Sequence, residues 1–224
     1  TFKAMNNLES AVKSYKKVVS LKPDFAAAYN NLGNVFKDLG QLEEALNSYK
    51  KVIAIKPDLP EPYNNLGNAF KDLNQLDNAV KSYKKAIEVK PNFAEAYNNL
   101  GNAFKDLDQL DDAVINYEKA IGINQNFAEA YFNLGVVFKQ LRQLDDAVIA
   151  YKNAISIKPD FAEAHNSLGS CFTVLGQTIS AIDCYEKAIR IKPDFDEAHN
   201  FLGFNFLSLG KIKEAAKSFE SAIS

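Results

Sequence analysis

The sequence predicts an all-α fold, a solenoid of antiparallel helix hairpins with a 34-residue repeat. The first observation behind this prediction is that the segment from Ala26 to Leu59 matches the following segments each time it is shifted by 34 residues. The second is that every repeat carries two apolar stripes at helical spacing. The third is that a single hairpin cannot bury its own apolar face, so successive hairpins must stack.

Three positions show the period most clearly. The fourth residue of the repeat is an aromatic or imidazole ring, at Tyr29, Tyr63, Tyr97, Tyr131, His165 and His199. The eighth is always a glycine, at Gly33, Gly67, Gly101, Gly135, Gly169 and Gly203. The eleventh is always a phenylalanine, at Phe36, Phe70, Phe104, Phe138, Phe172 and Phe206.

Each repeat predicts two helices and a short turn. In the first full repeat, the first helix carries apolar residues at Ala28, Leu32, Val35, Phe36 and Leu39, which lie on one helical face. The second helix repeats this pattern at Ala45, Leu46, Tyr49, Val52 and Ile53. Gly40 is expected to cap the first helix, and the proline at position 57 to stop the second. The glycine at position 33 and the alanine at position 45 are expected to let the two helices approach closely.

Along the chain, residues 1–25 are a partial repeat that carries second-helix positions. Full repeats follow at 26–59, 60–93, 94–127, 128–161 and 162–195, and residues 196–224 form a truncated seventh repeat. These repeats are expected to make one continuous solenoid. The junction near Gly122 and Gln125 is predicted to be the loosest, because Gln125 replaces the usual proline and Gly122 weakens the preceding helix.

This pattern resembles the tetratricopeptide repeat family over essentially the whole chain. The family has an aromatic, a Leu-Gly pair, two further aromatics and two alanines before a proline, and the first full repeat largely matches it with Tyr29, Leu32, Gly33, Phe36, Ala45, Tyr49, Val52 and Pro57. The first aromatic is Tyr or His in this chain and never Trp. The resemblance implies a right-handed superhelix, with the first helix of each repeat lining a concave groove.

Composition argues against several classes of partner. The chain has 224 residues and a formal net charge of −2, with lysines and acids interleaved, so we expect no nucleic-acid binding. No apolar run is long enough to predict a membrane span. Cys171 and Cys184 lie in one repeat and are expected to be free thiols in a reducing, cytoplasmic compartment.

The sequence contains no recognisable catalytic or metal-binding pattern. His165 and His199 occupy the position of tyrosines in the earlier repeats and are expected to pack as those tyrosines do. No further ligands converge on them, and no nucleophile elbow or phosphate-binding loop is present. We therefore expect no enzymatic activity and no cofactor.

Asparagines on the first helices are the strongest candidate for a binding site. Asparagine is a weak helix former, so several in each helix call for an explanation. They are Asn30, Asn31, Asn34, Asn64, Asn65, Asn68, Asn98, Asn99, Asn102 and Asn133. An amide both donates and accepts hydrogen bonds, so these residues could bind a peptide backbone irrespective of its sequence. At the equivalent surface, the seventh repeat has Phe201 and Phe204 instead.

The resemblance sharpens this expectation and leaves alternatives open. In the O-linked N-acetylglucosamine transferases, members of this family, an asparagine column lines the groove, and Asn31, Asn65, Asn99 and Asn133 match that column. The chain could thus be an interaction scaffold, or the targeting arm of a glycosyltransferase or sulfotransferase whose catalytic domain lies elsewhere. A solvated face produced by repeat duplication is the plainer alternative. A carboxylate clamp is disfavoured because the inner positions are amides.

The last repeat predicts an exposed apolar surface. The segment from Ile212 to Ser224 presents an apolar stacking face that no later repeat covers, made of Ile212, Ala215, Ala216, Phe219, Ala222 and Ile223. Such a face usually marks an interface. We therefore expect that the chain is a fragment of a larger protein, or that it self-associates through its terminal helices.

Overall fold

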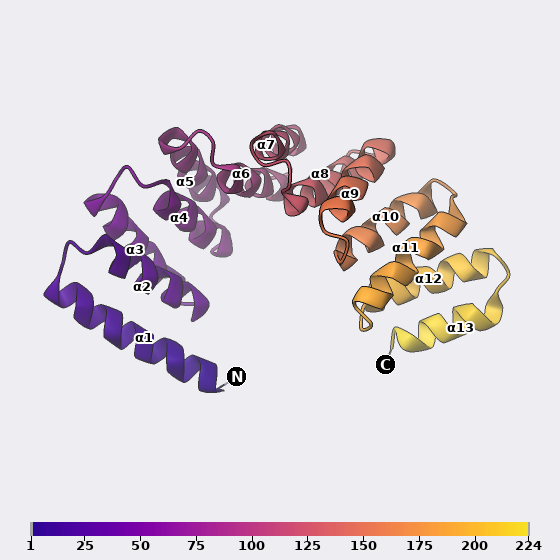
Figure 1. The fold of residues 1–224 in the computed structure, drawn as a ribbon, viewed down its shortest axis with the longest axis horizontal. Helices are drawn as coiled ribbons and strands as arrows, with labels where there is room; N and C mark the ends of the chain where they lie inside the picture. The colour runs from indigo at the N-terminus through magenta and orange to yellow at the C-terminus, as the bar shows by residue number, and fades with distance from the viewer. Residues whose placement is uncertain (1, 224) are drawn as a thin grey trace. The chain divides into compact units, whose positions relative to one another are not determined.

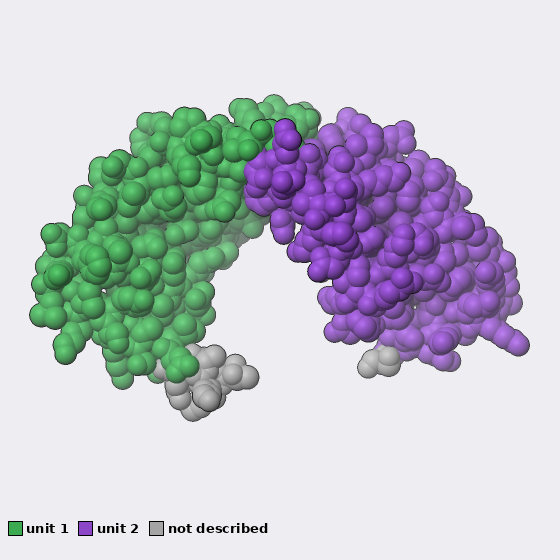
Figure 2. Space-filling model, viewed as in Figure 1, with its two compact units in different colours: residues 1–123 green, residues 124–224 purple. Residues whose placement is uncertain are grey.

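The computed structural model describes residues 2–223, and side chains from residue 7 onward. The described chain is all α-helical, in agreement with the prediction (Figure 1). It divides into two compact units, residues 1–123 and residues 124–224 (Figure 2). This division falls at the junction that the sequence predicts to be the loosest. The two units are described separately below.

From residue 2 onward, unit 1 contains seven helices: α1 (Phe2–Leu21), α2 (Ala26–Asp38), α3 (Leu42–Ile55), α4 (Pro60–Asp72), α5 (Leu76–Val89), α6 (Ala94–Asp106) and α7 (Leu110–Ile123). Helices α2 and α3, α4 and α5, and α6 and α7 pair as the predicted hairpins, and within the unit α3 packs on α4 and α5 on α6. Helix α1 packs on α2 in the same way.

Unit 2 contains six helices among the described residues: α8 (Ala128–Gln140), α9 (Leu144–Ile157), α10 (Ala162–Val174), α11 (Thr178–Ile191), α12 (Asp196–Ser208) and α13 (Ile212–Ser221). Its hairpins are α8–α9, α10–α11 and α12–α13, stacked in chain order. The last helix ends at Ser221, three residues before the predicted end at Ser224, which lies outside the described residues.

The turn inside each hairpin depends on one residue with a left-handed backbone. Gly40 has φ of 72° and directly follows the C-cap Leu39 of α2. The amide of Gly40 donates to the carbonyl oxygen of Lys37 at 2.9 Å, and that of Gln41 to Phe36 at 2.8 Å. This pair of bonds is a Schellman motif, so the predicted glycine cap is confirmed. Three non-glycine residues take the same place, with φ of 57° to 64°: Asn74, Asp108 and Arg142.

Small residues let the two helices of a hairpin approach, but the contact differs from the expected pairing of glycine with alanine. A Cβ atom on Gly101 would lie 2.7 Å from Cε1 of Tyr117, and the atoms nearest to every repeat glycine belong to the second-helix ring. The tyrosine rings themselves are fully buried: Tyr49, Tyr83, Tyr117, Tyr151 and Tyr185. Glycine is needed because its missing side chain makes room for this ring. Ala113 is buried in the same core.

Candidate functional site

The asparagines of unit 1 form three columns on helices α2, α4 and α6. The first column contains Asn30, Asn64 and Asn98; the second contains Asn31, Asn65 and Asn99; the third contains Asn34, Asn68 and Asn102. Each helix contributes one residue to each column, because the columns follow from the 34-residue repeat. The sequence predicted that all three columns line an open groove, and the structure assigns them different environments.

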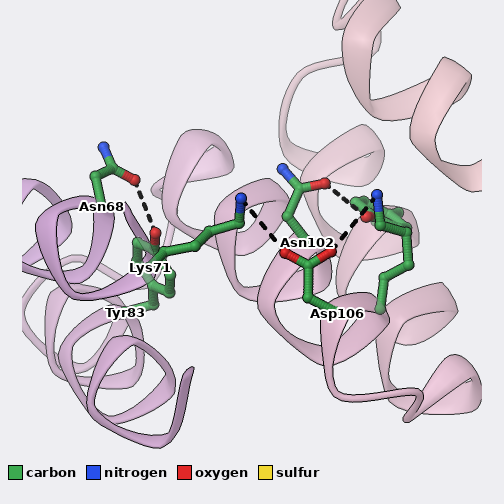
Figure 3. A network of polar contacts seen from close by, with 7 residues as sticks. Asn68, Lys71, Tyr83, Asn102 and Asp106 are labelled. Carbon is green, nitrogen blue, oxygen red and sulfur yellow. Dashed lines mark hydrogen bonds and ion pairs between the residues drawn. The ribbon is translucent and has the colours of Figure 1, made fainter. Parts of the chain in front are cut away.

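The third column is held in place by the core tyrosines. The hydroxyl of Tyr83 donates to Oδ1 of Asn68 at 2.8 Å (Figure 3). The hydroxyls of Tyr117 and Tyr49 donate in the same way to Asn102 and Asn34, each at 2.8 Å. Burial, with a smaller contribution from Asp38 and Asp72, raises the pKa of Tyr49 to about 12. The tyrosine therefore remains a protonated donor at neutral pH.

These bonds fix which end of each amide faces outward. Because Oδ1 accepts from the tyrosine, Nδ2 points away from it, as Asn68 and Asn102 show in Figure 3. The third column thus presents one amide donor per repeat, at equivalent positions. Sequence reasoning did not identify the tyrosine partner, although the tyrosine always follows the asparagine by 15 residues.

The second column donates to the first column of the preceding repeat. Nδ2 of Asn99 lies 3.0 Å from Oδ1 of Asn64, and Nδ2 of Asn65 lies 3.4 Å from Oδ1 of Asn30. Asn64 is 6% exposed and Asn98 is 7% exposed, so these two residues do not line an open surface as the sequence predicted. Their amides face the packing interface between neighbouring hairpins. Asn64 is therefore structural, and Asn65 and Asn99 retain their amide oxygens for another partner.

Lysines beside the third column pair with aspartates of the next repeat. Nζ of Lys71 lies 3.4 Å from a carboxylate oxygen of Asp106 (Figure 3). Nζ of Lys37 lies 3.8 Å from one of Asp72. Lys105 approaches Asp106 to 3.8 Å. The sequence places each lysine next to an aspartate in its own repeat but does not show that the pairing crosses to the following one. The positive charges of this surface are thus largely compensated.

In unit 2 the third column has no asparagine, and the second column keeps one only on α8. Asn133 on α8 continues the second column, and Val136 follows at the third. Helix α10 has Ser167 and Ser170 at these positions, and α12 has Phe201 and Phe204.

The two phenylalanines of α12 differ in exposure. Phe201 stacks on Tyr185 with ring centroids 5.7 Å apart. Phe204 is 60% exposed and packs edge-on against Phe219 at 5.2 Å. Ile212 and Ile223 of the predicted apolar face are exposed, but Ala215 is buried and Phe219 packs inside the hairpin, so only part of that face is open.

The two histidines take over the hydrogen bond of the tyrosine they replace. The hydroxyl of Tyr63 donates to the carbonyl oxygen of Pro57 at 3.2 Å. Nε2 of His165 lies 3.0 Å from the Pro159 oxygen, and Nε2 of His199 lies 2.9 Å from that of Pro193. Since a carbonyl oxygen only accepts, Nε2 carries the proton in both residues. The predicted replacement of tyrosine by histidine is confirmed.

Other reactive side chains do not form a recognisable centre. Within residues 7–223, no group of three or more histidine, cysteine or acidic side chains could hold a metal ion. Both cysteines are buried free thiols. Burial, reinforced by Asp183, raises the pKa of the Cys184 thiol to about 11, so this thiol is poorly reactive at neutral pH. Among residues 2–223, no helix is both long and apolar enough to span a membrane.

Models of known protein families match most of the chain. A model described as "TPR repeat" matches residues 1–40, 33–73, 67–108 and 101–142. A model described as "Tetratricopeptide repeat" matches residues 128–161 and 162–195. Comparison with curated proteins gives no match.

Solved structures extend the same comparison. The crystal structure of MamA shares 30% sequence identity and a TM-score of 0.66, over 70% of this chain and 92% of MamA. YrrB, described as a TPR protein with an unusual peptide-binding site, shares 24% identity and a TM-score of 0.64, over 84% of this chain and 96% of YrrB. PilF of Pseudomonas aeruginosa shares the fold at 17% identity, with a TM-score of 0.79 over 86% of this chain and 88% of PilF. On the family matches and the similarity to MamA, this chain belongs to the tetratricopeptide repeat family.

Proposed function

We propose that the chain is a protein-interaction scaffold, and that helices α2, α4 and α6 of unit 1 bind an extended peptide through their asparagines. The observation that carries the proposal is the third column, where each core tyrosine holds an asparagine with Nδ2 pointing outward. An amide nitrogen fixed in this way can donate to a peptide carbonyl without first losing rotational freedom. Oδ1 of the second column can accept from a peptide N–H.

This arrangement favours contact with the peptide backbone over its side chains. The donors and acceptors are uncharged amides that recur once per repeat, and the nearby lysines are already paired with aspartates. Low dependence on peptide sequence is therefore expected. YrrB shares only the fold with this chain, so the proposal rests on the asparagines and not on YrrB's peptide-binding site.

A targeting role for a glycosyltransferase or sulfotransferase remains a prediction from the asparagine column. The relatives named above include no O-linked N-acetylglucosamine transferase. Binding of a peptide by unit 1 serves a scaffold and a targeting arm equally, and requires no catalytic step by this chain.

The test replaces Asn68 and Asn102 by aspartate. A carboxylate still accepts the tyrosine hydroxyl, but it removes the outward Nδ2 donor. A peptide first selected from a display library on the whole chain should bind the double variant about ten-fold more weakly, the usual effect of losing one or two good hydrogen bonds. Methylation of the peptide's backbone nitrogens should also weaken binding, whereas alanine substitutions along it should have little effect.

Asn47→Asp with Asn92→Asp is the matched control. Both residues are exposed, both lie in unit 1 away from the three columns, and the change in charge is the same. This control should bind the peptide as the parent does. Equal binding by the two double variants would show that the third column does not contact the peptide, and the proposal would then be wrong.

A further inference from the structure

A pocket of about 460 Å³ in unit 2 differs in chemistry from the asparagine surface of unit 1. Helix α8 contributes Val136, Lys139 and Gln140, and the turn that follows contributes Arg142. Leu144 at the start of α9 and Val174 at the end of α10 complete the lining. Its volume lies in the range of pockets that bind small ligands or side chains. It combines an apolar floor with two cations, and no carboxylate is among these lining residues.

Comparison of equivalent positions within the chain shows how this pocket arises. In unit 1, Lys71 pairs with Asp106, the aspartate that lies 35 residues further along the chain. The residue 35 positions after Lys139 is Val174, so a valine stands where Lys71 has its aspartate partner. Nζ of Lys139 instead donates to Oγ of Ser170 at 2.8 Å, a neutral partner. One uncompensated charge therefore stands beside an apolar side chain that is 60% exposed.

Arg142 adds a second charge at a strained position. Its φ is 64°, and the equivalent residues are Gly40, Asn74, Asp108, Gly176 and Gly210. A left-handed backbone costs a residue other than glycine, asparagine or aspartate about 1–2 kcal/mol. Such strain is often retained where it serves a function. Among side chains 7–223, neither Arg142 nor Lys139 forms an ion pair, even though Asp145 and Asp146 lie close to Arg142 in sequence.

A second pocket of unit 2 contains two lysines whose charges already have partners. That pocket is lined by Lys152, Lys187 and Asp183, among other residues. Nζ of Lys187 lies 2.7 Å from a carboxylate oxygen of Asp183, and Lys152 stands over the ring of Phe172 at 5.7 Å. Its cations thus already have partners within the protein.

We propose that the pocket of Val136, Lys139, Arg142 and Val174 binds an internal segment of a partner protein in which an acidic side chain adjoins a branched aliphatic one. The carboxylate pairs with Lys139 and Arg142, and the aliphatic group covers Val136 and Val174. Charge complementarity selects this occupant, because two unpaired cations disfavour a basic segment and the exposed valines disfavour a wholly polar one. The inference goes beyond the proposed peptide binding by unit 1, since it uses none of the asparagines.

The probe is an eight-residue peptide with two Asp-Leu pairs between glycines and serines, acetylated at its N-terminus and amidated at its C-terminus. Fluorescence anisotropy with the whole chain measures its binding. Arg142→Gly should weaken binding about ten-fold, the usual effect of one charge-assisted hydrogen bond. Glycine accepts the positive φ of this position, so the variant is expected to fold as the parent does. Val174→Asp restores the unit 1 pairing at Lys139 and should weaken binding at least as much.

Lys213→Gln is the charge-matched control. Lys213 is exposed on α13, and its substitution removes one positive charge from the same unit. It should leave binding unchanged. The Asn68→Asp and Asn102→Asp variant should also bind the probe as the parent does, which separates this inference from the function proposed for unit 1. Peptides with Asn-Leu or Asp-Ser pairs should bind weakly, and higher salt should weaken the Asp-Leu probe.

Several results would overturn the proposal. No binding of the Asp-Leu probe by the parent chain is one, and unchanged binding by both Arg142→Gly and Val174→Asp is another. Binding of an Asn-Leu peptide with a free C-terminal carboxylate, but not of the amidated Asp-Leu probe, would assign the pocket to chain ends instead.

Discussion

At the residue scale, the tightest requirement in this chain is the space between each repeat glycine and the ring of the second helix. In every complete repeat that ring belongs to a buried tyrosine, whose hydroxyl in unit 1 also orients a third-column asparagine. The packing core and the candidate binding surface of unit 1 are therefore joined by the same side chain. A change at the glycine should disturb both.

Alanine substitution at Gly101 and Gly122 should have opposite effects on stability. Both glycines are helical, so each gains about 1 kcal/mol in helix propensity. A Cβ on Gly101 would lie 2.7 Å from Tyr117, whereas one on Gly122 meets no atom within 4 Å. Overpacking costs about 1–3 kcal/mol. Urea denaturation should thus show Gly101→Ala losing about 1 kcal/mol and Gly122→Ala gaining about as much. Equal shifts in the same direction would mean that the ring of Tyr117 moves aside freely.

The sequence predicted the asparagine columns, but it could not show the environment of each one. The period places residues at equivalent positions along the chain, which is why the columns were visible. Whether Asn64 faces a groove or the next hairpin depends on rotation about the helix axis by a few tens of degrees, which spacing alone does not determine. The partnership of Asn68 with Tyr83 depends likewise on how two helices pack.

At the scale of the helix and its turn, the sequence was most informative where residue type and backbone conformation are tightly linked. Gly40 signals a left-handed cap, and Pro57 follows the end of α3. The same turn occurs with Asn74, Asp108 and Arg142, which residue type alone signals less clearly. Alignment with the glycine repeats makes the position evident. Arg142 is the least expected of the three, since it lacks the short polar side chain that eases this conformation.

Glycine substitution at these turns should stabilise the protein most where the residue it replaces is most strained by a positive φ. Arg142→Gly should raise the free energy of unfolding by about 1 kcal/mol, because arginine bears the full cost of positive φ. Asn74→Gly should change it by much less, since asparagine tolerates this conformation. Thermal and urea unfolding of the two variants test this order. A destabilised Arg142→Gly would mean that the arginine side chain contributes more to the fold than its backbone costs.

At the scale of the whole molecule, stacking of near-identical repeats explains why much of the fold could be predicted from the sequence. Within each unit, helices pack chiefly on their neighbours in the chain, so the period determines which helices meet. The division into two units was not predicted as such, although it falls where one repeat lacks its proline. The sequence shows that asparagines of unit 1 are replaced by apolar residues in unit 2. It does not show that Lys139 and Arg142 lack acidic partners, which became clear only when the ion pairs of unit 1 were compared with the same positions in unit 2.

Gln125 marks the loop at this division, and restoring proline there should stabilise the chain. The loops after α3, α5, α9 and α11 carry Pro57, Pro91, Pro159 and Pro193 at the same position, and the backbone of residues 124–127 follows the same course of turn and helix start. Among the described residues, the amide of Gln125 donates no backbone hydrogen bond that proline would remove.

Proline at a compatible position adds about 0.4–1 kcal/mol, because it restricts the unfolded chain. Gln125→Pro should therefore raise the urea midpoint, and Pro159→Gln in unit 2 should lower it by a similar amount. Circular dichroism through a urea titration measures both. One interaction already stabilises the present loop without a proline: the amide of Asn126 donates to Oδ1 of Asn124 at 3.1 Å. This interaction could reduce the gain from the proline. If Gln125→Pro lowers the midpoint while Pro159→Gln lowers it as well, this loop has a backbone conformation of its own, and the missing proline reflects that conformation.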